Sequence, residues 1–65
     1  MVMINGEEKE AAGMTISEYL LKNDYNVLQI VVERNEEIVP KATYDEVMLA
    51  DGDVVEIVHF VGGGA

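Results

Sequence analysis

The residues of this chain that are best suited to chemistry stand at its carboxyl end. Gly62-Gly63-Gly64-Ala65 follow directly after the apolar run of residues 54–61. Glycine has no Cβ, so such a segment can pass through a channel as narrow as a backbone and leaves a terminal carboxylate unhindered. The expected chemistry is activation of that carboxylate in the active site of another protein. Terminal glycines are also typical of a frayed chain end, and the segment alone leaves both interpretations open.

Size and composition exclude several kinds of site within the chain itself. Sixty-five residues form one domain with a small core, so we expect no enclosed active site. The absence of cysteine excludes a disulfide framework, a thiolate metal site and a thiol nucleophile. His59 is the single histidine, which favours a packing role over that of a base or a metal ligand. We therefore predict no metal site.

The charge balance indicates which partners the chain can meet. Thirteen acidic and four basic residues give a formal net charge of −9. Such a chain repels nucleic acid and anionic membranes and favours partners with basic surfaces. It contains neither a long apolar run nor the basic and apolar stretches of a signal peptide. The sequence predicts a cytoplasmic protein that is a monomer when free.

The first half of the chain predicts a hairpin and a helix. Asn5-Gly6 after the apolar residues 1–4 is a strong signal for a tight turn, with residues 7–11 as the second strand. Thr15 and Glu18 have the spacing of a capping box, which predicts a helix from Ile16 to about Asn23. Within that helix we expect the i, i+4 pair Ile16 and Leu20 to face the core.

The second half predicts the remaining strands. Residues 27–33 are rich in β-branched side chains, and alternation places Leu28, Ile30 and Val32 on the buried face. The weaker turn signal Asn35-Glu36 precedes a short edge strand that ends before Pro40. Residues 44–49 are expected to make one helical or 3₁₀ turn, with Val47 and Leu49 as candidate core residues. Asp51-Gly52 turns the chain into the last strand, and turn chemistry explains its Asp51 and Asp53 better than a metal pair does.

These elements predict a two-layer α+β domain. Its mixed sheet has four to five strands packed on one helix. The expected domain spans residues 1–61, and residues 62–65 form a glycine-rich C-terminal segment.

Alternation along the last strand also predicts a docking surface. Val55 and Ile57 should face the helix, so Val58 and Phe60 should point away from it. Met3 and Val31 are expected on the same outer side. We predict that these four outward residues form a docking patch beside the C-terminal segment, with Gly62 part of the contact. Singly exposed apolar residues are common on any surface, and this is the alternative interpretation.

Three stretches carry a resemblance to a known family. The chain contains Ile4-Asn5-Gly6-Glu7, Ile38-Val39-Pro40-Lys41, and the run of residues 49–58 followed by Phe60-Val61-Gly62-Gly63-Gly64. Over its whole length it resembles the sulfur carrier of thiamine thiazole biosynthesis, a ubiquitin-like β-grasp family.

The resemblance implies a protein co-substrate and not an enzyme. An E1-like enzyme would use ATP to adenylate the terminal glycine carboxylate. A sulfur donor system such as a cysteine desulfurase would supply the sulfur of a thiocarboxylate, and thiazole synthase would receive it. The family's terminal pair matches Gly63 and Gly64, so Gly64 would carry the sulfur after loss of Ala65. No cofactor is expected on the carrier itself.

Three departures from the family pattern mark what stays open. Asn35-Glu36 stands where Asn-Gly is frequent, and Lys41 stands where arginine is frequent. Ala65 extends the chain beyond the reactive glycine, and is either removed by a peptidase or a residue added for expression. The alternatives are the small subunit of molybdopterin synthase, another ubiquitin-like sulfur carrier or protein modifier, and a non-covalent β-grasp interaction module.

Overall fold

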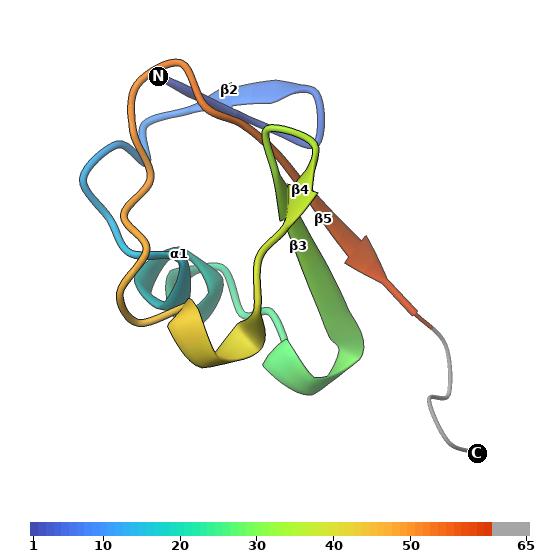
Figure 1. Cartoon of the computed structure of the whole chain (residues 1–65). Coiled ribbons are helices and arrows are strands. Elements are labelled where there is room, and N and C mark those ends of the chain that lie inside the picture. The colour runs from blue at the N-terminus through green and yellow to red at the C-terminus, as the bar shows by residue number, and fades with distance from the viewer. Residues whose placement is uncertain (61–65) are drawn as a thin grey trace.

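The computed structural model describes residues 1–60 of the chain, and within them one mixed sheet packs against one α-helix. Figure 1 shows the helix α1 facing the sheet, and β5 leading away from the amino terminus. The strand order is β2-β1-β5-β3-β4. The β1–β5 pair is parallel, and the other neighbouring pairs are antiparallel. The elements are β1 (Val2–Ile4), β2 (Glu7–Lys9), α1 (Ile16–Lys22), η1 (Val27–Gln29), β3 (Ile30–Arg34), β4 (Glu37–Ile38), η2 (Lys41–Thr43) and β5 (Val54–His59).

The predicted α+β architecture is confirmed by this sheet and helix. The boundary expected after Val61 stays a prediction, because residues 61–65 lie outside the described part. Within residues 1–60, no helix is long and apolar enough to cross a membrane.

Both hairpins turn through residues with positive φ. Asn5 and Gly6 have φ of 51° and 82°, as the predicted tight turn between β1 and β2 requires. Asn35 and Glu36 have φ of 51° and 71° between β3 and β4. The second turn therefore adopts the same left-handed backbone without a glycine, which costs conformational energy at Glu36.

The helix begins as its capping box predicts. The Thr15 side chain accepts a hydrogen bond from the Glu18 amide at 3.1 Å, and the Glu18 carboxylate accepts one from the Thr15 amide at 2.9 Å. The helix ends at Lys22, and Asn23 is its C-cap, so the predicted end differs by one residue. Ile16 and Leu20 are both buried against the sheet.

Local side-chain bonds change two of the predicted elements. Leu28 is 78% exposed and not in the core, because the Asn26 side chain accepts from the Leu28 amide and starts the 3₁₀ helix η1. The 3₁₀ turn predicted at 44–49 lies earlier, where Thr43 Oγ1 donates to the Pro40 carbonyl.

The second strand also ends earlier than predicted, at Lys9, because Ala11 leaves the sheet edge for the core. As predicted, Leu49 is buried and Val47 packs against the core. The buried apolar residues form one cluster: Val2, Ile4, Ala11, Ile16, Tyr19, Leu20, Ile30, Val32, Tyr44, Leu49, Val55 and Ile57.

Candidate functional site: the outer sheet face and the end of β5

The strand β5 has one buried and one exposed face, as alternation predicts. Val55 and Ile57 are 2% and 6% exposed on the side of α1. On the opposite side, Val54, Val58 and Phe60 are 51%, 53% and 40% exposed. We call this opposite side of the sheet the outer face.

The predicted docking patch is divided into two parts on this outer face. Val31 lies opposite Val58 in the β3–β5 register, and Phe60 follows two residues later. Met3 instead lies beside Val54 at the start of β5. The charged residue Glu56 separates these two apolar parts. The structure therefore brings Val31, Val58 and Phe60 together, and it places Met3 apart from them.

Two further apolar residues of the outer face were not included in the predicted patch. Val54 is exposed beside Met3, and Ile38 is exposed opposite Glu33 on the edge strand β4. Alternation along β5 already indicated Val54. The register of the β3–β4 hairpin was needed to place Ile38, and the sequence offered no reliable signal for that register. The docking role predicted for Met3, Val31, Val58, Phe60 and Gly62 stays a prediction.

The end of β5 is held from the side of β3. The Phe60 amide donates to the Gln29 carbonyl at 3.1 Å, and the Phe60 ring centroid lies 6.0 Å from Lys41 Nζ. The same ammonium group donates to the Val27 carbonyl at 2.9 Å and to the Ile30 carbonyl. Lys41 thus joins the start of β3 to the last described residue before the C-terminal segment. This role of Lys41 is not predicted by the sequence, in which Lys41 is only a departure from the arginine frequent in the family.

Asn5 holds β5 from the side of β1. Its Oδ1 accepts from the Ile57 amide at 2.8 Å, and its Nδ2 lies 3.4 Å from the Ile57 carbonyl oxygen as donor. The strand β1 has ended at Ile4, so this side chain continues the ladder by one step. Asn5 therefore has two roles: it allows the hairpin turn, and it holds β5 at Ile57, three residues before Phe60.

The remaining polar groups near β5 have structural roles. His59 is exposed, and its ring stacks on Tyr25 with centroids 5.5 Å apart, which supports the packing role expected for it. Residues 1–60 contain no group of three or more side chains arranged to hold a metal ion. Asp51 forms an ion pair with the amino-terminal ammonium group and does not form a metal site with Asp53.

Asp53, the residue directly before β5, is charged and buried. Its carboxylate accepts bonds from the Ala50 amide at 2.8 Å, Arg34 Nε at 2.9 Å and Asn35 Nδ2 at 3.1 Å. Burial alone would raise the pKa of the Asp53 carboxyl, but these three donors outweigh it and lower the pKa below its usual value. Asp53 is therefore a charged anchor for the turn before β5, as the turn interpretation predicts.

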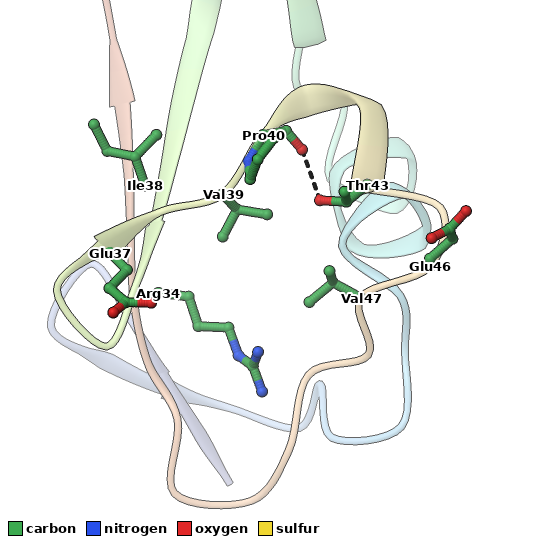
Figure 2. Close-up of a pocket in the computed structure, with 8 residues that line it drawn as sticks. All are labelled: Arg34, Glu37, Ile38, Val39, Pro40, Thr43, Glu46 and Val47. Atoms are coloured by element: carbon green, nitrogen blue, oxygen red, sulfur yellow. Dashed lines mark hydrogen bonds between the residues drawn. The ribbon is translucent and has the colours of Figure 1, made fainter.

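A surface pocket of about 400 Å³ lies away from the end of β5. Figure 2 shows Arg34 reaching toward Val47, with Val39 on the wall and Glu37 and Glu46 at the sides. The lining comes from the ends of β3 and β4, from η2 and from the turn after it. No residue of β5 lines this pocket.

The family is decided by a comparison over nearly the whole chain. The model of the ThiS family matches residues 2–64. This chain belongs to the ThiS family. The chain is 46% identical over 67 aligned positions to the sulfur carrier protein ThiS of Bacillus subtilis, covering 98% of this chain and 100% of that one. A crystal structure of ThiS from Geobacter metallireducens superposes with a TM-score of 0.78 at 28% identity, covering 97% of both chains. The β-grasp fold expected from the resemblance is thereby confirmed.

Other relatives are much longer than this chain. A thiazole synthase of Paramagnetospirillum magneticum is 46% identical over 65 aligned positions, which cover 98% of this chain and 20% of that protein. A thiazole synthase of Magnetococcus marinus matches in the same way at 39% identity, again over 20% of its length. The chain thus spans about a fifth of these two relatives, and each carries a ThiS-like segment in one polypeptide with the rest of a thiazole synthase.

Proposed function

We propose that this chain is a sulfur carrier of thiamine biosynthesis and that Gly64 carries the sulfur. The observation that supports the role most directly is the family match, because full-length relatives are sulfur carriers. The match ends at residue 64, so Ala65 lies beyond the part shared with the family. Gly62, Gly63 and Gly64 themselves lie outside the described residues.

The proposed chemistry takes place at the terminal carboxylate. An oxygen of the Gly64 carboxylate attacks the α-phosphorus of ATP in an E1-like enzyme, and pyrophosphate leaves. The outer sulfur of a persulfide on a donor such as a cysteine desulfurase then attacks the acyl carbon, and AMP leaves. A thiol then cleaves the sulfur–sulfur bond to the donor, which releases the thiocarboxylate and leaves a disulfide on the donor cysteine. Glycine favours both steps because no Cβ stands beside the reacting carbon. The chain is the co-substrate of these reactions, which we expect in the cytoplasm.

The chain's own contribution is to bind its partners and to present its end. Bonds from Asn5 and Gln29 and the contact with Lys41 fix the end of β5, so the C-terminal segment starts from a defined position. The outer face beside it supplies exposed apolar area for docking. Thiazole synthase is the partner with the strongest support, since relatives join a ThiS-like segment to it in one chain.

Removal of Ala65 is the step that the proposal requires before activation. An added residue lengthens the chain by about 3.3–3.6 Å. An error of about 1 Å in positioning a reacting group can cost on the order of a hundredfold in rate. The 65-residue form should therefore be a poor substrate, and the form ending at Gly64 a good one.

The test is ATP–pyrophosphate exchange with the cognate activating enzyme on both forms at equal concentration. Intact mass measurement then detects exchange of one oxygen for sulfur at the terminus. We expect exchange and the mass change with the form ending at Gly64. Equal rates for the two forms would contradict the processing step, and no exchange with either form would contradict the sulfur-carrier role.

A further inference from the structure

Two carboxylates stand directly opposite each other on the outer face. Glu33 of β3 and Glu56 of β5 are Cα partners in the antiparallel register, next to the pair Val31 and Val58. Their neighbours Val32 and Ile57 are buried on the side of α1, so both glutamates point to the outer side. Like charges directly opposite each other in a sheet destabilise the free protein.

No basic group of the chain compensates this pair. Among residues 1–60, the ion pairs involve other acids, and residues 61–65 contain no basic side chain. The four basic side chains and the amino terminus are placed as follows: Lys9 with Glu7, Arg34 with Asp53, Lys41 on backbone carbonyls, the amino terminus with Asp51, and Lys22 in the last turn of α1. The pair therefore carries two negative charges that no basic side chain in this chain neutralises.

Exposed apolar side chains surround the pair. Val54 and Val58 flank Glu56 along β5, and Ile38 is the cross-strand partner of Glu33 on β4. A partner that covers these three residues also removes the carboxylates from water. Such a partner must supply a cation, because leaving two carboxylates unpaired in an interface is costly. Arginine suits the position, since its planar guanidinium can donate to both carboxylates and pack on aliphatic side chains.

We propose that Glu33 and Glu56 together receive an arginine side chain of thiazole synthase when the outer face docks on that enzyme. This inference rests on the proposed function and identifies the chemistry of its interface. The repulsion in the free carrier becomes attraction in the complex, so the pair selects a basic partner surface. The net charge of −9 favours the same kind of partner.

The test is a double variant, Glu33→Gln with Glu56→Gln, which keeps the side-chain shape and removes both charges. Glu37→Gln with Glu46→Gln is the matched control, because it makes the same change in net charge and both residues line the pocket with Arg34 instead of lying on the outer face. Urea unfolding gives the stability of each free chain. Titration calorimetry with the cognate thiazole synthase, at low and high salt, gives the affinity.

The proposal expects effects of opposite sign in the double variant. Its urea midpoint should rise, while its affinity for thiazole synthase should fall about tenfold, which corresponds to about 1.4 kcal/mol. Its affinity should also depend less on salt than that of the wild type. The control should keep most of the wild-type affinity.

Three results would count against the inference alone: unchanged affinity in the double variant, an equal loss in the control, or an unchanged urea midpoint. A wild-type chain that neither binds thiazole synthase nor supports thiazole formation would contradict the proposed function as well. The wild-type measurement therefore distinguishes the two failures.

Discussion

The two faces of β5 carry similar side chains but have opposite environments. Val55 and Ile57 are buried against α1, whereas Val54 and Val58, one residue away along the same strand, are more than half exposed. The difference arises from what covers each face and not from residue type. On the inner face, apolar area already contributes to the stability of the free protein, while on the outer face the same kind of area remains available to a partner.

The comparison also separates two uses of charge. At the inner start of β5, Asp53 is buried and surrounded by three donors. On the outer face, Glu56 stands opposite Glu33, and no ion pair among residues 1–60 includes either carboxylate. The first arrangement is complete in the free protein, and the second is complete only in a complex.

The largest effect should follow from a change on the inner face. Ile57→Ala removes a buried aliphatic side chain, which typically costs about 2–5 kcal/mol. Because the whole free energy of unfolding of a small domain is of the order of 5 kcal/mol, the variant should be largely unfolded or close to it. Circular dichroism during urea unfolding measures this.

The matched control is Val58→Ala on the outer face, where we expect a change of no more than about 0.5 kcal/mol. A destabilisation of Val58→Ala as large as that of Ile57→Ala would show that the two faces do not differ as the structure indicates.

A smaller loss of stability is expected when Asp53 loses its charge. Asp53→Asn keeps the shape of the side chain but weakens the bond to Arg34, and should cost about 1–3 kcal/mol at neutral pH. The pKa of the Asp53 carboxyl is lowered in the folded state, so between its folded and unfolded values the unfolded chain binds more protons. The contribution is thus fully present above the usual aspartate value of about 3.9 and is lost as the pH falls through the folded value.

Unfolding free energy measured from pH 7 downward tests this prediction. The wild type should lose more stability in the acid range than Asp53→Asn does. Parallel pH curves for the two proteins would mean that Asp53 does not anchor β5 through its charge.

On the outer face, Phe60→Glu should change binding more than stability. The side chain is partly exposed, and the new carboxylate would stand near Lys41 Nζ, so the fold should persist. Loss of an aromatic contact at the edge of the C-terminal segment should weaken binding to thiazole synthase about tenfold or more. Calorimetric titration gives the affinity, and the urea midpoint gives the stability. If Phe60→Glu instead lowered the urea midpoint strongly and left the affinity for thiazole synthase unchanged, Phe60 would belong to the buried face and not to the outer face.

The buried and exposed faces of β5 and much of the local structure could be predicted from the sequence, because alternation and helix caps are short-range properties. The faces of β5, the capping box at Thr15 and Glu18, and the turn at Asn5-Gly6 each depend on residues within a few positions of one another. Leu28 was misplaced since one side-chain bond from Asn26 competes with the strand pattern.

The rest depended on contacts between distant segments. The separation of Met3 from Val31 follows from the strand order, and the pairing of Glu33 with Glu56 follows from the register. The role of Lys41 at the end of β5 needed the path of the chain after Pro40. Alternation predicts which face a residue occupies, but it does not predict which residue of another strand lies beside it.

The smallest expected effect concerns the turn between β3 and β4, which carries Ile38 to the outer face. Glu36 has a φ of 71°, a left-handed conformation that costs conformational free energy in a residue with a Cβ but not in glycine. Glu36→Gly should therefore raise the unfolding free energy by about 0.5–1 kcal/mol relative to Glu36→Gln, which makes the same change in charge but keeps the Cβ. Urea unfolding of the two variants isolates the backbone effect.

Affinity for thiazole synthase should be the same in both Glu36 variants, because the turn residue itself does not lie on the outer face. A gain in stability without a gain in affinity would show that the free energy of the fold and that of docking are separable in this chain. If Glu36→Gly instead bound more tightly than Glu36→Gln, the position of Ile38 relative to Glu33 would be adjustable in the free protein, and the outer face would be completed by the partner and not presented in advance.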